Sequence, residues 1–132
     1  LKKIVFNLRN KKKIFMVEGQ VSNPTTTIFV SKIVKECCKN YYNKKNMFKG
    51  VFHLANEPAL SKIEFTKYVY FNLKKLNLIK NDCKIVKISS NKFKNYAKRP
   101  QNSSFDLKKI KRKTINKNFN WKRILRKILI KI

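Results

Sequence analysis

The spacing of apolar side chains in the first third of the chain predicts helix, strand and helix in turn. Residues 1–8 place an apolar set on one helical face, namely Leu1, Ile4, Val5 and Leu8. Residues 14–17 form a short apolar run that favours a strand, and Asn23-Pro24 indicates a turn. Thr25, Thr26 or Thr27 can then cap a helix with five apolar members, Ile28, Phe29, Ile33, Val34 and Cys37.

The rest of the chain continues this alternation. Residues 39–49 are polar and lack a period, so they predict a connection, after which Gly50 opens a strand at residues 51–54. Ser61 and Glu64 have the spacing of a capping box at the start of a helix that carries Ile63, Thr66, Tyr70, Leu73 and Leu76. Residues 85–88 predict another strand, and a loop with Arg99-Pro100 follows. A last helix carries the stripe Trp121, Ile124, Leu125, Ile128 and Ile132.

Composition adds a large positive charge to this α/β pattern. The 132 residues hold 34 Lys and Arg against 6 Asp and Glu, a formal charge of +28, which is typical of partners rich in phosphate. However, 29 of these residues are Lys and only 5 are Arg, and Asn and Ile are abundant while Gly and Pro are scarce, as codon bias in an AT-rich genome would produce. A nucleic-acid binder favours the bidentate Arg fork, and the Lys residues are scattered over the chain. We therefore expect no specific nucleic-acid partner.

Cysteines and signals narrow the chemistry further. The chain has an odd number of cysteines, Cys37, Cys38 and Cys83, and a single histidine, His53. We therefore expect no structural zinc site, and we expect the three thiols to be reduced. No targeting signal is visible, and no run approaches the roughly 20 apolar residues of a membrane span. We expect a cytoplasmic protein. Because the chain begins with Leu rather than Met, we also expect the natural start to lie upstream.

Three segments, taken in order, carry a resemblance to a known family. Residues 17–25 (V-E-G-Q-V-S-N-P-T) resemble a V-x-D-Q-x-G-x-P-T segment, and residues 50–57 with 61–65 resemble a G-x-Y-H-L-A strand and an S-x-x-E-F helix start. Residues 97–106 (A-K-R-P-Q-N-S-S-F-D) are similar to an A-x-R-P-x-N-S-x-L-D loop, and Trp121 begins a last helix. Together they resemble the C-terminal half of the dTDP-4-dehydrorhamnose reductase family of extended short-chain dehydrogenases.

The resemblance implies an α/β, Rossmann-like fold, in which residues 1–132 form one substrate-binding region with late sheet strands and covering helices. It implies part of an oxidoreductase that reduces a dTDP-4-dehydro-6-deoxy sugar to dTDP-L-rhamnose with NADPH or NADH. Since Gly19 and Gly50 are the only glycines, no dinucleotide fingerprint exists here, and the cofactor is expected on an N-terminal half absent from this chain. The implied partner is a dTDP-sugar, a homodimer of the full-length protein is allowed, and the chain alone is expected to be inactive.

The same resemblance nominates eight substrate-binding residues in two loops: Gln20, Asn23, Pro24, Thr25, Lys98, Arg99, Asn102 and Ser103. A guanidinium grips a diphosphate with two parallel hydrogen bonds, so Arg99 is left open between ligand contact and a structural ion pair. For Asn102 and Ser103, turn capping around Pro100 is the favoured interpretation. Gly19 stands where the family has Asp and Thr26 where an aromatic residue is common, which leaves substrate specificity open.

No residue of this chain is expected to be catalytic, to bind the cofactor or to bind a metal. Two Tyr-x-x-x-Lys pairs occur, Tyr41 with Lys45 and Tyr70 with Lys74, where 5 Tyr and 29 Lys give about one pair by chance. Both fall in segments that correspond to substrate-domain or covering helices. His53 is expected to be a packed core residue rather than a catalyst.

Alternatives remain open at this stage. The basic, amphipathic last helix suits a membrane surface, although a helix that covers a sheet needs the same stripe, and the second interpretation is favoured. For function, the alternatives are another nucleotide-sugar reductase or epimerase, a non-catalytic relative such as the regulatory subunit of methionine adenosyltransferase, and a basic nucleic-acid-binding domain.

Overall fold

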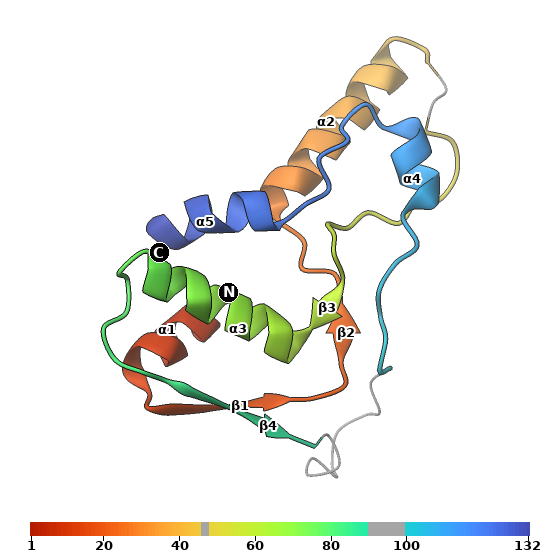
Figure 1. Cartoon of the computed structure of the whole chain (residues 1–132). Coiled ribbons are helices and arrows are strands. Elements are labelled where there is room, and N and C mark those ends of the chain that lie inside the picture. The colour runs from red at the N-terminus through yellow and green to blue at the C-terminus, as the bar shows by residue number, and fades with distance from the viewer. Residues whose placement is uncertain (46–47, 90–99) are drawn as a thin grey trace.

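The computed structural model describes residues 1–45, 48–89 and 100–132 and has the expected α/β fold. Its sheet pairs β1 (Lys13–Val17) with β4 (Lys84–Ile88) in parallel, with Phe15 opposite Val86. Helices α1 (Lys2–Asn10) and α3 (Lys62–Lys75) cover one face of this sheet (Figure 1). The predictions of a first helix, of strands at residues 14–17 and 85–88, and of a helix after Ser61 are confirmed.

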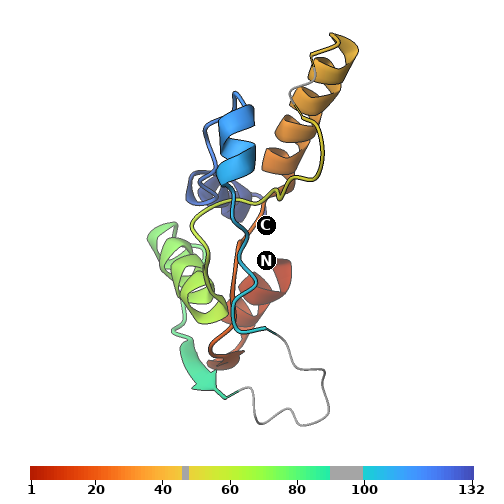
Figure 2. The same cartoon turned by 90° about the vertical axis from the view of Figure 1, so that its right-hand side faces the viewer.

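The remaining elements extend the molecule away from the sheet. β2 (Val21–Ser22) pairs antiparallel with β3 (Leu60–Ser61), and α2 (Thr27–Tyr42) runs outward from there. The chain then returns through α4 (Lys108–Lys113) and ends on α5 (Lys122–Ile130). Figure 2 shows the result as an elongated molecule with the sheet at one end and α2 at the other.

Two apolar cores correspond to the two ends. The larger joins α1, β1, α3 and α5, with Trp121, Leu73 and Leu129 nearly inaccessible to solvent. The smaller joins α2 to α4, to the segments on either side of α4 and to the segment before β3. Both figures place α1 and α3 between α5 and the sheet. The last helix therefore covers other helices rather than the sheet itself, because its apolar stripe packs on the aromatic side chains of α3.

The helix starts that the sequence predicts are built by side-chain caps. The Thr26 hydroxyl accepts a hydrogen bond from the Phe29 amide at the start of α2. At the start of α3, the Ser61 hydroxyl accepts from the Glu64 amide at 3.2 Å, and the Glu64 carboxylate accepts from the Ser61 amide at 2.7 Å. These reciprocal bonds satisfy two orphan amide groups of the helix, so the predicted capping box is confirmed.

Other predictions from the pattern are wrong. Residues 51–54 form no strand, and Val51 is 79% exposed. The bridge nearest to this segment is made by the later residue Glu57, with Asn120. α2 continues to Tyr42, past the point where a polar connection was expected, because the helix projects from the molecule and needs only one apolar face. Ile28 and Val34 accordingly lie exposed, while Phe29 and Ile33 are buried. The short helix α4 was not predicted.

One face of the β1–β4 pair has no cover among the described segments. Ile14, Met16 and Ile85 point into the larger core, whereas Phe15, on the opposite face, is 56% exposed. The Lys13 ammonium lies 5.1 Å from the centre of the Phe15 ring.

In the part of the chain that the structure describes, no helix has the length and apolar character to span a membrane.

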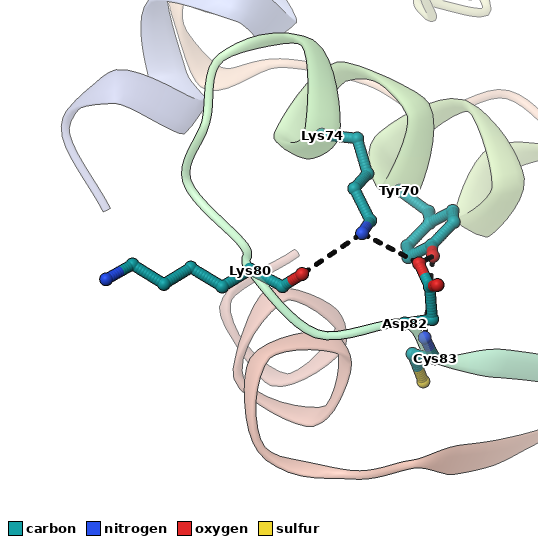
Figure 3. A network of polar contacts seen from close by, with 5 residues as sticks. All are labelled: Tyr70, Lys74, Lys80, Asp82 and Cys83. Carbon is teal, nitrogen blue, oxygen red and sulfur yellow. Dashed lines mark hydrogen bonds and ion pairs between the residues drawn. The ribbon is translucent and has the colours of Figure 1, made fainter.

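A polar clamp fixes the connection between α3 and β4. Tyr70 and Lys74 project from α3 and meet Asp82, with the Tyr70 hydroxyl donating at 3.0 Å and the Lys74 ammonium 2.7 Å away (Figure 3). Lys74 also donates to the Lys80 carbonyl, and the Cys83 amide donates to the Tyr70 oxygen. This Tyr-x-x-x-Lys pair is thus engaged in holding a loop closed.

Replacing Asp82 by Asn is expected to remove an acid-sensitive part of the stability. Hydrogen bonds from Lys74 and Tyr70 hold the pKa of Asp82 below its ordinary value of 3.8. The ion pair therefore stabilises the fold fully above that ordinary value and is lost as pH falls through the lowered pKa. The effect is small and salt-dependent because both groups are exposed. Urea unfolding between about pH 2 and pH 6 measures it. The exposed Glu18→Gln serves as control, and an equal pH response in both variants would contradict the assignment.

Candidate functional site

A pocket of about 710 Å³ lies where the loop after β1 meets the starts of α1 and α3. We call it the Gln20 pocket. Its polar rim is formed by residues of the loop after β1, of the start of α3 and of the segment that begins at residue 100, and its apolar wall comes from α1, α3 and α5. The rim includes Gln20, Ser22, Thr25, Thr26, Thr27, Ser61, Lys62 and Ser103, and the wall includes Leu1, Ile4, Leu60, Phe65, Trp121, Leu125 and Ile128.

Backbone hydrogen bonds bring the two predicted substrate loops together. The Val21 amide donates to the Gln101 carbonyl at 2.8 Å, and the Ser103 amide donates to the Val21 carbonyl at 2.9 Å. The Lys62 amide donates to the Gln20 carbonyl at 3.3 Å, which ties the same loop to α3. Residues about 80 positions apart in sequence thus form one rim, as parallel-type pairing between Val21 and Asn102 requires.

Of the eight nominated residues, four line the Gln20 pocket: Gln20, Pro24, Thr25 and Ser103. Gln20 is half-buried, and its backbone carbonyl accepts a hydrogen bond from the Lys62 amide. The Thr25 hydroxyl donates to the Asn23 carbonyl and the Ser103 hydroxyl donates to the Val21 carbonyl, each at 3.1 Å. The Thr25 oxygen also accepts from the Asn56 amide at 3.4 Å, so both hydroxyl groups help to hold the loops in place.

Asn23 and Asn102 do not line this pocket. The Asn23 amide donates to the Asn56 carbonyl and its oxygen accepts from the Phe105 amide, both at 2.9 Å. The Asn102 oxygen accepts from the Ser104 amide two residues on, at 2.9 Å, as in an Asx-turn. Both side chains shape the loops. Lys98 and Arg99 lie outside the described residues.

The residue that organises this site, Asn56, was missed by the sequence reasoning. Its side chain is fully buried, and its oxygen accepts from the Thr26 amide at 2.9 Å and from the Thr26 hydroxyl at 3.1 Å. Its amide donates to the Phe119 carbonyl at 2.9 Å. Hydropathy patterning assigns Asn to the surface, and no local signal marks this one as buried, because its partners lie about 30 and 63 positions away.

The expectation that His53 is a packed core residue is wrong. His53 is exposed and stacks on Phe105 with a ring-centre distance of 4.9 Å and an interplanar angle of 9°. The expected strand does not form, so alternation along residues 51–54 does not turn this side chain inward.

Gly19 precedes the rim in a left-handed conformation, with φ at +77° and open space around the position of a missing Cβ. Gly adopts this conformation freely, and Asp and Asn tolerate it better than most other residues. The backbone of this turn therefore accommodates either Gly or the Asp of the resemblance, and the difference changes the charge offered beside Gln20.

The chemistry of the Gln20 pocket is suited to binding. The described residues that line it include no carboxylate, imidazole or thiol, so they supply no pair for general acid–base work. No group of three potential metal ligands occurs among the residues described. All three cysteines are free, and burial is the main cause that raises the pKa of the Cys37 and Cys83 thiols, which keeps them protonated.

Comparisons with known proteins agree with this arrangement. The family model of the RmlD substrate binding domain matches residues 1–132, whereas no curated protein matches the chain. Among solved structures, the chain is similar to dTDP-4-dehydrorhamnose reductase from Bacillus anthracis in complex with NADP, with a TM-score of 0.78 and 18% identity. It is also similar to an orthologous reductase from Clostridium acetobutylicum, with a TM-score of 0.74 and 22% identity, and to the Yersinia enterocolitica reductase, with a TM-score of 0.72 and 18% identity.

The match extends over nearly all of this chain but less than half of those enzymes. It covers 99% of the chain and 42% of the Bacillus protein, 99% and 43% for the Clostridium protein, and 96% and 41% for the Yersinia protein. These neighbours show the fold, and the family model, which matches the whole chain, shows the family. The chain belongs to the RmlD substrate binding domain family.

Proposed function

We propose that this chain forms the sugar-nucleotide-binding region of a reductase that converts dTDP-4-dehydrorhamnose to dTDP-L-rhamnose. The observation that carries the proposal is the Gln20 pocket, where the two nominated loops meet. Its amide and hydroxyl rim offers hydrogen bonds to sugar hydroxyls, while its aromatic and aliphatic wall suits the apolar faces of a base or a deoxy sugar. Lys98 and Arg99 are proposed to bind the diphosphate.

Hydride chemistry is proposed to reside outside this chain. NADPH or NADH supplies the hydride in such a reaction, and one neighbour was solved with NADP. The chain holds two glycines, too few for the Gly-rich turn that cradles a dinucleotide, so its own residues do not fit the cofactor. The role proposed for these 132 residues is to bind and orient the sugar nucleotide, in a cytoplasmic enzyme whose cysteines stay reduced.

The uncovered sheet face supports a larger parent protein. Parallel sheets occur almost only where both faces are covered, and Phe15 is more than half exposed on the open face of β1. Among the described residues, no further strand pairs with either outer edge of this two-stranded parallel sheet. Further strands and helices of an α/β domain are the natural partners of this face.

Titration with dTDP tests the proposal. We expect saturable binding by the chain, with backbone amide shifts centred on the rim of the Gln20 pocket. Gln20→Ala is expected to weaken binding about five-fold, the loss of one hydrogen bond of about 1 kcal/mol. Gln101→Ala is the matched control, because Gln101 is exposed and contributes only its backbone carbonyl to the rim.

Activity of the full-length protein provides the second readout. We expect NADPH oxidation with dTDP-4-dehydrorhamnose as substrate. Binding without selectivity for dTDP over other nucleotides, or turnover of a different nucleotide sugar instead, would overturn the specific assignment. Absence of saturable dTDP binding in both chain and full-length protein would overturn the binding role itself.

A further inference from the structure

A second hollow, of about 750 Å³, is lined by a different set of residues, and Asn23 is the one residue of its described lining that was nominated for the sugar nucleotide. We call it the Arg123 pocket. Its described lining is drawn from residue 23, residues 57–59, residues 104–105 and residues between 111 and 123. Its lining comprises Asn23, Glu57, Pro58, Ala59, Ser104, Phe105, Lys111, Lys117, Asn118, Phe119, Asn120 and Arg123.

The two pockets share a wall. Neighbouring residues of one segment face opposite sides: Ser103 lines the Gln20 pocket and Ser104 the Arg123 pocket, and Trp121 and Asn120 divide in the same way. The wall is held by backbone bonds, since the Glu57 amide donates to the Phe119 carbonyl at 2.8 Å and the Trp121 amide donates to the Glu57 carbonyl at 3.2 Å. These bonds hold the two segments of the wall together, and the Lys117 and Arg123 side chains lie exposed at the rim of the hollow.

The charged side chains of the described lining are three cations, Lys111, Lys117 and Arg123, and one carboxylate, Glu57. The Glu57 carboxylate forms an ion pair with the Lys111 ammonium, with a nitrogen–oxygen distance of 2.5 Å. Lys117 and Arg123 have no acidic partner among the described residues, and Lys117 is positioned by donation to the Lys111 carbonyl at 2.7 Å. One of only five arginines in a chain with 29 lysines thus lines this pocket, and its guanidinium makes no hydrogen bond to any other described residue.

The neutral groups of the lining are also suited to an acceptor-rich ligand. The Asn120 oxygen is used by the Lys122 amide at 2.9 Å, so its NH₂ group is left as a donor. The Ser104 hydroxyl is a further donor at the opposite side, and Phe105, with His53 stacked on it, adds an exposed flat ring. Cations and amide donors around one hollow are the groups that bind phosphate oxygens.

We propose that the Arg123 pocket is a binding site for a phosphate group, held by Arg123 and Lys117 and separate from the Gln20 pocket. The phosphate can be free or part of a nucleotide, and both sources share this chemistry. The proposal stands independently of the sugar-nucleotide assignment, because it uses different residues on the other side of the shared wall.

Titration of the ¹⁵N-labelled chain with inorganic phosphate, at constant ionic strength set with sodium chloride, tests the site. We expect saturable shifts of the Ser104, Asn118 and Arg123 amides, and about ten-fold weaker binding in Arg123→Ala. Arg126→Ala is the matched control, since Arg126 is exposed on the same helix and lines neither pocket. A parallel titration with dTDP shows which source of phosphate binds there.

Each possible result of these titrations either supports or overturns the phosphate site. Equal weakening in the two variants would show diffuse attraction to a chain of charge +28 and would overturn the site. Shifts that never saturate, or that are confined to the Gln20 pocket, would overturn it as well. Failure of the phosphate site leaves dTDP shifts at Gln20 intact, whereas failure of the sugar-nucleotide proposal removes those shifts and leaves the Arg123 response.

Discussion

Trp121→Ala is expected to destabilise the chain by about 4 kcal/mol, the cost typical of emptying a large aromatic site in a core. Trp121 is 1% exposed and packs edge-on against Phe65 and Tyr68, with ring centres 5.3 and 5.1 Å away. Its indole also donates to the Pro58 carbonyl at 2.9 Å. Because small domains have only about 5–15 kcal/mol of net stability, urea unfolding should move to much lower denaturant or vanish.

A control on the same helix separates packing from helix propensity. Ile130→Ala removes an apolar side chain that is 62% exposed and should change stability by less than about 0.5 kcal/mol. Trp121→Phe keeps a ring but leaves the Pro58 carbonyl without its partner, so an intermediate loss of roughly 1–3 kcal/mol is expected. Equal losses in Trp121→Ala and Ile130→Ala would contradict the central place given to Trp121.

Asn56→Asp is expected to lower the free energy of unfolding by about 3 kcal/mol near neutral pH, although it replaces only the side-chain NH₂ group by an oxygen. The new carboxylate keeps an acceptor for Thr26 but loses the donor to the Phe119 carbonyl and brings a charge into a fully buried place. Burial raises the pKa of such a carboxyl group. The variant should therefore regain stability as pH falls through that raised pKa, because the protonated acid can donate again.

Urea unfolding of wild type and variant at several pH values measures this loss and its partial recovery. Asn81→Asp is the control, since Asn81 is exposed and its replacement adds the same charge to the surface. A loss in Asn56→Asp that grows on acidification would contradict the hydrogen-bond network assigned to Asn56. A loss no larger than that of Asn81→Asp would show that the network is not required.

Local chemistry was readable from the sequence where the interacting groups are close along the chain. The Ser61–Glu64 capping box, the Thr26 cap, and the strands β1 and β4 depend on side chains within a few positions of each other or on short apolar runs. The family resemblance likewise rested on motifs in order, and the family model now matches residues 1–132.

The hydropathy pattern gave wrong predictions where a segment's packing depends on residues far away in the sequence. Residues 51–54 look like a strand because a short, mainly apolar run follows Gly50, yet no strand pairs with them and His53 is exposed, stacked on Phe105. The face of α2 that carries Val34 is exposed because the helix projects from the molecule, which no local period reveals. The meeting of Tyr70, Lys74 and Asp82 is likewise a product of the fold around a chance motif.

The sequence by itself determined the α/β class, the family and the caps of α2 and α3, because these depend on residue type and short spacing. Only the tertiary structure decided that Gln20 and Ser103 share a rim, that Asn23 and Asn102 hold loops, and that Asn56 joins three segments. It alone showed Arg123 and Lys117 around a second hollow. The physical reason is that hydrogen bonds and pockets between residues 30 to 80 positions apart exist only after the chain has closed those loops.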